Sequence, residues 1–121
     1  MSIFLVAFDG SPQAYKALDK VSRILEEKDS IIIASVVSNG KEKAAMQEAV
    51  NEALKFLRER GQKAVAFIEE GEIAERLIRI AEELYCDTIV LGEPRKEKWY
   101  HQESVAQKIT KKTRVPVIIV R

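Results

Sequence analysis

The sequence predicts an α/β fold: an open five-stranded parallel sheet with helices on both faces, in one domain over residues 1–121. Three observations lead to this prediction. Short apolar runs alternate along the chain with longer segments whose apolar residues recur at helical spacing. The runs lack the apolar–polar alternation of a half-solvated strand, as expected for strands buried on both faces. No repeat, linker or low-complexity segment breaks this order.

The first apolar run, Ile3–Phe8, is predicted to be a buried strand. Asp9 follows it in a turn that leads into a helix, with Ser11 as the N-cap and Pro12 in the first helical position. The apolar stripe of this helix ends near Glu27, where we expect the helix to stop.

The second strand is predicted over residues 31–37, and a long helix follows the loop at 38–40. Gly61 is a stop signal for that helix. The third strand, over residues 63–68, contains small and polar residues, which is typical of a strand at the edge of a sheet.

Gly71 precedes the third helix, and its position favours a turn that needs a positive φ over an anion site. The fourth strand is predicted over residues 88–91 and ends at Gly92. An eleven-residue polar loop then leads to a helix capped by Ser104. The last strand is predicted over residues 115–120.

Composition excludes several classes of protein. Twenty basic and nineteen acidic residues leave the chain nearly neutral, which does not suggest a nucleic-acid-binding face. The single cysteine, Cys86, excludes an internal disulfide and fits a reducing compartment. No apolar run approaches the ~18 residues of a membrane span, and the N-terminus lacks the basic region of a signal peptide. We therefore expect a soluble, cytoplasmic protein.

Candidate ligand-binding residues follow the predicted strands, where ligands of parallel sheets collect. Asp9 either contacts a ligand or organises its own turn by an Asx-type bond. Gly92 lets a ligand approach the backbone closely or serves the bend after its strand. Ser104 and Val105 begin a helix whose free amides could bind phosphate, and Ser104 with Gln107 also has the spacing of a capping box.

Familiar catalytic signatures are missing. There is no G-x-x-x-x-G-K-S/T phosphate loop, and no G-x-G-x-x-G follows the first strand. His101 and Cys86 are the only residues of their types, and a metal site would need more such ligands. No nucleophile–base pair can be named, so hydrolysis by a dedicated catalytic set is not supported. A phosphoreceiver domain would want an acidic cluster after the first strand, and Asp9 stands there alone.

Three segments together resemble the universal stress protein family, and they cover nearly the whole chain. They are FLVAFDGSPQAYKAL, EEGEIAERLIRIAEELYCDTIVLG and SVAQKITKKTRVPVIIVR. The resemblance implies the sheet of the adenine nucleotide alpha hydrolase-like folds, and a homodimer formed through the last strand. The interface residues would then be Val115, Val117, Ile118, Ile119 and Val120.

Many members of the family bind ATP through a G-x-x-G-x9-G-S/T pattern after the fourth strand. The resemblance therefore makes ATP with Mg²⁺ the candidate cofactor, although no cofactor is assigned. By position, Asp9 matches the acidic residue near the nucleoside, and Val36 the backbone that reads adenine. Gly92 matches the first glycine of the pattern, and Ser104 with Val105 its end.

The middle of the pattern departs from the family. Arg95 and Glu103 stand where the second and third glycines belong, and the loop is shorter by two residues. Side chains there obstruct the close wrapping of phosphates by backbone amides, and Glu103 adds a repelling charge. Arg95 could instead contact phosphate from outside the loop. We expect the ATP binding of the family type to be weakened or lost.

Trp99, Tyr100 and His101 give the loop an unusual composition. The two aromatic residues either stack on a base or a partner protein, or fold back over the end of the sheet, which we favour slightly. His101 is expected to be solvated and not catalytic. The main functional hypothesis is a non-catalytic stress-response module that acts through dimerisation and partner contacts. The alternative is a switch that binds an adenine nucleotide through Asp9, Val36, Gly92 and Ser104.

Overall fold

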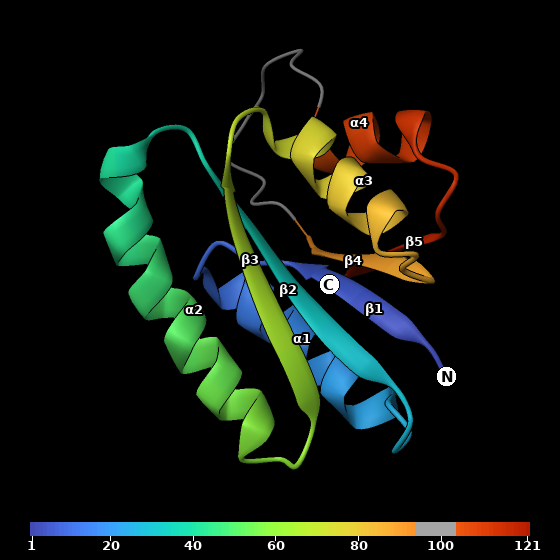
Figure 1. The fold of residues 1–121 in the computed structure, drawn as a ribbon. Coiled ribbons are helices and arrows are strands. Elements are labelled where there is room, and N and C mark those ends of the chain that lie inside the picture. Colours follow the sequence, from blue (N-terminus) through green and yellow to red (C-terminus); the bar gives the residue numbers. More distant parts are fainter. Residues whose placement is uncertain (94–103) are drawn as a thin grey trace.

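The computed structural model describes residues 1–93 and 104–121, and it confirms the predicted α/β fold (Figure 1). Parallel strands form one five-stranded sheet in the order β3-β2-β1-β4-β5. The strands are β1 (Ile3–Ala7), β2 (Ser30–Val37), β3 (Lys63–Glu70), β4 (Thr88–Gly92) and β5 (Val117–Val120). The helices are α1 (Pro12–Ile24), α2 (Lys43–Arg58), α3 (Ile73–Glu83) and α4 (Val105–Lys112), and a 3-10 turn, η1 (Gly40–Glu42), precedes α2.

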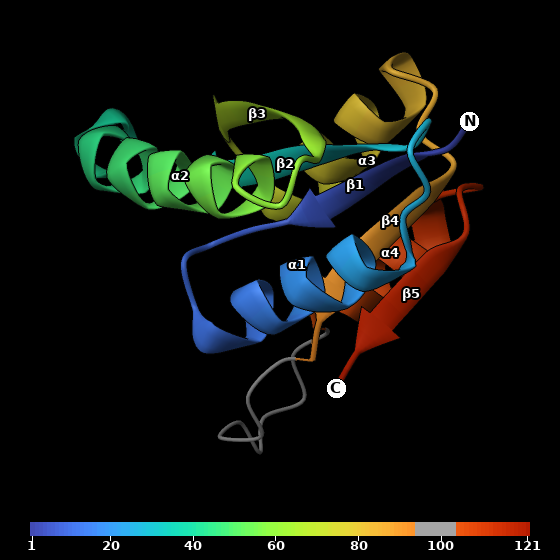
Figure 2. The same ribbon diagram turned by 90° about the horizontal axis from the view of Figure 1, so that it is seen from below.

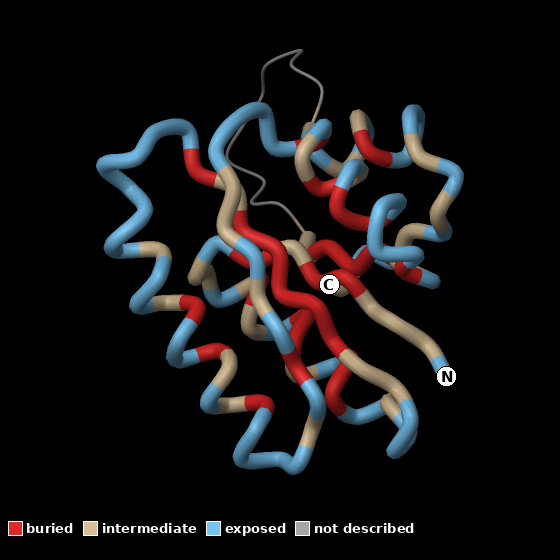
Figure 3. The backbone as a smooth tube through the Cα atoms, in the orientation of Figure 1, coloured by how far each residue is buried: buried red, intermediate tan, exposed pale blue. Residues whose placement is uncertain are grey.

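Helices cover both faces of the sheet, as the sequence predicted. One core lies between the sheet and α1 with α2, and the other lies between the sheet and α3 with α4. Figure 2 shows α1 and α3 on opposite sides of the strands. The buried residues concentrate along the central strands (Figure 3), because only these strands have neighbours on both edges. This burial explains their unbroken apolar sequences.

Helix α1 ends at Ile24, earlier than the expected stop near Glu27. Leu25 is already extended, with ψ of 144°. The Asp29 carboxylate then accepts a hydrogen bond from the Glu26 amide at 3.0 Å and fixes the loop. A side chain after the helix therefore competes successfully for a backbone donor that could have extended it.

Four strand boundaries also differ from the prediction, while the edge position of β3 is confirmed. β1 ends at Ala7 and β2 begins at Ser30, each one residue from the predicted bound. β3 runs two residues beyond Ile68, to Glu70, because it stays in register with β2 over its whole length. β5 begins at Val117 and not at Val115, because the Val115 amide donates to the Thr113 hydroxyl at 3.0 Å.

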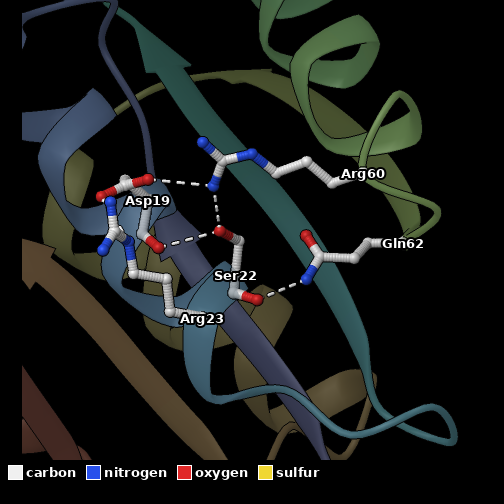
Figure 4. Close-up of polar contacts among 5 residues, drawn as sticks. All are labelled: Asp19, Ser22, Arg23, Arg60 and Gln62. Carbon is white, nitrogen blue, oxygen red and sulfur yellow. Dashed lines mark hydrogen bonds and ion pairs between the residues drawn. The ribbon is translucent and has the colours of Figure 1, made fainter.

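A polar cluster at the amino-terminal edge of the sheet ties α1 to the turn between α2 and β3 (Figure 4). Arg60 Nη1 donates to Asp19 Oδ1 at 2.9 Å and also to the Ser22 hydroxyl. Arg23 Nε lies 3.1 Å from the other Asp19 oxygen, and Gln62 donates to the Ser22 carbonyl. The hydrogen bond from Arg60 is the main reason why the pKa of Asp19 lies below its usual value. The cluster fixes how α1 lies against the β3 side of the molecule.

Candidate functional site

The strand order creates a switch point between β1 and β4. β2 and β3 lie on one side of β1, and β4 and β5 lie on the other, so successive connections leave β1 in opposite directions. In open parallel sheets the crevice at the carboxyl ends of such a strand pair is the usual ligand site. Three of the predicted residues lie at the carboxyl ends of strands: Asp9 follows β1, Val36 is the last but one residue of β2, and Gly92 ends β4. The fourth, Ser104, is the N-cap of α4.

Asp9 lies in the turn after β1 and is exposed. Its Oδ1 accepts a hydrogen bond from the Ser11 amide at 2.9 Å, and Gly10 has a φ of +83°. Ser11 in turn accepts from the Ala14 amide at 3.2 Å and caps α1. Asp9 therefore organises its own turn, as one of its two interpretations predicted. Its second carboxylate oxygen makes no hydrogen bond among the described residues.

Gly92 brings the end of β4 against the first turn of α1. A Cβ at this position would lie 2.6 Å from the carbonyl oxygen of Gln13 and 2.8 Å from its carbonyl carbon. The neighbouring atoms are backbone, so they cannot rotate away. The contact between the strand and the helix therefore requires a glycine independently of any ligand, a reason that the sequence did not reveal.

Ser104 begins α4 with a complete capping box. Its hydroxyl accepts a hydrogen bond from the Gln107 amide at 3.1 Å, and its own amide donates to Gln107 Oε1 at 2.8 Å. The capping-box interpretation is confirmed. Two groups that could have reached a phosphate are thus engaged inside the helix, which leaves the amides of Val105 and Ala106 as the free donors of the first turn.

Val36 lies near the end of β2, where β1 no longer covers it. β1 stops opposite Ala34, and the Phe8 amide donates to the Ala34 carbonyl at 2.9 Å. Because the hydrogen-bonding direction alternates along a strand, the N–H and C=O of Val36 face the space beyond the end of β1. This is a donor–acceptor pair directed at the switch point.

Ser35 is a residue of this edge that the sequence analysis missed. It is 1% exposed, and its hydroxyl donates to the Phe8 carbonyl at 2.7 Å. The bond fixes the chain just before Asp9 against β2. A serine inside an otherwise apolar run was the available signal, since a buried hydroxyl needs a partner.

The remaining predicted residues are distributed differently. Arg95, Trp99, Tyr100, His101 and Glu103 lie outside the described residues. Residues 1–93 and 104–121 contain no group of three or more histidine, cysteine or carboxylate side chains that could hold a metal ion. Within the same residues, no helix is long and apolar enough to cross a membrane.

Cys86 is buried, and burial is the main cause that raises the pKa of its thiol to about 11.

The predicted interface residues lie on or beside β5, at the edge opposite β3. Val115, Val117 and Val120 are half-buried, and they contact the two cores of the domain. Ile118 and Ile119 are 43% and 46% exposed. The strand thus presents apolar side chains on both of its faces along an edge that no other described strand covers.

Comparisons with known proteins give a consistent result. A family profile described as the universal stress protein family matches residues 1–121. No curated protein sequence matches significantly. A universal stress protein family structure from Burkholderia pseudomallei shares 28% identity, with a TM-score of 0.77 and coverage of 98% of this chain and 95% of that one.

Two further structures resemble the fold at lower identity. A universal stress protein in complex with cAMP is 22% identical, with a TM-score of 0.86 and coverage of 99% and 96% of the two chains. The universal stress protein from Archaeoglobus fulgidus in complex with dAMP is 18% identical, with a TM-score of 0.80 and coverage of 100% and 98%. The fold is therefore shared over the full length of all three structures.

Proposed function

The chain belongs to the universal stress protein family, and from this premise we propose that it is a non-catalytic stress-response module. It forms a homodimer joined through β5, and it acts by contacting partner proteins. Its binding of adenine nucleotides is weakened relative to the ATP-binding members of the family. The observation that carries this proposal is the uncovered apolar edge of β5.

The backbone of β5 supports pairing with a second copy. The Pro116 carbonyl accepts a hydrogen bond from the Ile89 amide at 2.9 Å, and the Val120 carbonyl accepts one from the Glu93 amide at 2.8 Å. Even-numbered residues of β5 therefore face β4, and the N–H and C=O groups of Val117 and Ile119 point outward. Two such edges can pair around a two-fold axis, and the exposed side chains of Ile118 and Ile119 are then covered.

Sedimentation of the purified protein tests the dimer. We expect the wild type to sediment as a dimer at micromolar concentration, and the variants Ile118→Lys and Ile119→Lys to shift toward the monomer. Val65→Lys is the matched control, because Val65 is 53% exposed and lies on β3, at the opposite edge of the sheet from β5. A wild-type monomer at high concentration, or a dimer that resists both β5 substitutions, would contradict the proposal.

The proposal of weakened nucleotide binding rests on hydrogen bonds within the protein that already engage the polar groups of the site. The Ser104 hydroxyl and amide are engaged in the capping box, and one Asp9 oxygen is engaged by the Ser11 amide. A phosphate would compete with these bonds, and only the amides of Val105 and Ala106 would be left to receive it in the first turn of α4. The replacement of two family glycines by Arg95 and Glu103 acts in the same direction.

The alternative function is an adenine-nucleotide switch, and a specific observation favours it. The outward backbone pair of Val36 and the free Asp9 oxygen lie at adjacent strand ends, and together they could read a base edge and a ribose hydroxyl. The structures of similar fold in complex with cAMP and dAMP support adenine nucleotides as the ligand class.

Calorimetric titration with ATP, AMP and cAMP, with and without Mg²⁺, separates the two functions. The proposal expects dissociation constants of about 1 mM or weaker, which corresponds to about −4 kcal/mol. Asp9→Asn is the informative variant, because an amide oxygen can still accept from Ser11 while the charge is removed. Saturable micromolar binding that this variant abolishes would establish the switch instead.

A further inference from the structure

The outer edge of β3 has backbone groups that no described strand covers. The Gly71 amide donates to the Val37 carbonyl at 3.0 Å, so the odd-numbered residues of this segment face β2. The even-numbered ones face outward, and Arg58 Nη2 indeed reaches the outward Ala64 carbonyl at 3.3 Å. Beyond Ala64, the N–H and C=O groups of Ala66 and Ile68 remain at the edge.

A groove runs beside these groups, because α2 lies along the outer side of β3 (Figure 1). Its upper part is a hollow of about 410 Å³, lined by Lys43, Ala44, Gln47, Val50, Ala66 and Ile68. A second hollow of about 440 Å³ continues along α2, lined by Asn51, Leu54, Lys55, Arg58 and Glu59. The helix positions recur at three- and four-residue spacing, so both hollows follow one stripe of α2. We call this feature the β3 edge groove.

Apolar side chains flank the same edge on the opposite face of the sheet. Val65 is 53% exposed and Phe67 is 38% exposed, and both point away from α2. On the α2 face, the wall of the groove is formed by the small or aliphatic residues Ala66 and Ile68. A strand laid along this edge would therefore meet apolar surface with both sets of its alternating side chains.

We propose that the β3 edge groove binds an extended peptide segment of a partner protein, which adds as a strand antiparallel to β3. Backbone hydrogen bonds to Ala66 and Ile68 hold the peptide, and α2 forms the wall of its site. This mode of recognition joins a sheet edge to a neighbouring helix stripe. The peptide has β-branched residues at its centre, a basic residue toward its N-terminus and an acidic residue toward its C-terminus.

The charges at the two ends of the groove determine this polarity. Glu69 and Glu70 lie at the carboxyl end of β3, where Lys43 pairs with only one of them, Glu70, at 3.6 Å. The Oε1 atom of Glu69 is buried and has no hydrogen-bond partner among the described residues, so a basic side chain that displaced its cover would satisfy it. Lys55 and Lys63 lie toward the other end and complement an acidic residue. For a strand antiparallel to β3, these charges place the basic residue toward the N-terminus of the peptide and the acidic residue toward its C-terminus.

The position of α2 argues against a second copy of this chain as the occupant. Pairing two β3 edges around a two-fold axis would place both α2 helices on the same face, above adjacent strands. Neighbouring strands lie about 4.8 Å apart, whereas packed helices need 8–10 Å between their axes. A segment that carries no helix beside its strand avoids this overlap.

The test uses the full-length protein and the synthetic peptide acetyl-Lys-Thr-Val-Thr-Val-Glu-amide, with amide hydrogen exchange followed by NMR. With the peptide at ten times its dissociation constant, we expect exchange at Ala66 and Ile68 to slow by about tenfold. The amides of Val65 and Phe67 already face β2, so their exchange should not change. The same peptide with N-methyl groups on alternate residues should give no protection.

A pair of helix variants checks the location. Ala44→Phe places a large side chain in the hollow and should abolish binding, whereas Ala45→Phe, at an equally exposed position outside the lining, should not. Lack of protection at millimolar peptide overturns the proposal, as does binding that Ala44→Phe leaves unchanged. Protection of Ala66 and Ile68 in the protein alone that grows with protein concentration would assign the edge to a second copy and would also overturn it.

Discussion

The contact between Gly92 and the Gln13 backbone allows a quantitative prediction. Widening the 2.6 Å separation between the new Cβ and the Gln13 carbonyl oxygen to ordinary contact, which begins at 3.4 Å, requires a shift of about 0.8 Å. Overpacking of this kind typically costs about 1–3 kcal/mol, and the lower chain entropy of alanine offsets about 0.4–1 kcal/mol. We therefore expect Gly92→Ala to lower the free energy of unfolding by about 1–2 kcal/mol.

Equilibrium unfolding in urea measures this loss, and a midpoint lower by about 1 M is expected for a domain of this size. Gly61 provides the control, because it has a φ of +74° and a Cβ added there would meet no atom within 4 Å. Gly61→Ala should cost about 1 kcal/mol through its backbone conformation, and asparagine should recover part of the loss there. Gly92→Asn should recover nothing, since overlap with a backbone does not depend on φ.

Wild-type stability in Gly92→Ala would refute this reasoning. It would mean that α1 and β4 can separate slightly without cost. The glycine would then have to be explained by its place in a ligand site. The experiment thus distinguishes a glycine required for packing against α1 from a glycine required for nucleotide binding.

Three further predictions concern single side chains. Tyr85 has a φ of 54° and is 86% exposed, so Tyr85→Gly should raise the free energy of unfolding in urea by roughly 0.5–1 kcal/mol; a loss would contradict the backbone argument. The hydrogen bond from Arg60 lowers the pKa of folded Asp19, so its stabilising contribution is present above the unfolded pKa and is lost as pH falls below about 3.8. Urea midpoints of Asp19→Asn should therefore fall less steeply in acid than those of the wild type, and parallel curves would count against the pair. The pKa of about 11 for buried Cys86 predicts slow alkylation by iodoacetamide at pH 8 in the native protein and rapid alkylation in denaturant; equal rates would show that the thiol is accessible.

Local signals in the sequence were sufficient for several element boundaries. Ser11 with Pro12 starts α1 where predicted, and Ser104 with Gln107 forms the expected capping box. Gly71 has the expected positive φ, of 140°. Each of these features depends on residues a few positions apart, so the sequence contains the whole interaction. The edge position of β3 was also predictable, because its residues suit a half-solvated strand.

Contacts between distant segments were not predictable in the same way. Gln13 and Gly92 meet only because the strand order places β4 beside β1, and nothing near either residue indicates the other. The β3 edge groove likewise depends on how α2 lies against β3. For the candidate site, the sequence located the correct edge of the sheet. It left open whether Asp9 and Ser104 serve a ligand or their own turns, and the structure resolved their local bonds.

Helices from each half of the chain pack on strands from the other half. α1, from the first half, contacts β4 and β5, which follow much later, and α3, from the second half, contacts β2 (Figure 2). Residues 1–70 alone would leave α1 without two of its strands, and the rest of the chain would lack the central strand β1. Neither fragment can bury its own apolar surface. We therefore expect a single cooperative unfolding transition, and two separately expressed halves that gain structure only when they are mixed.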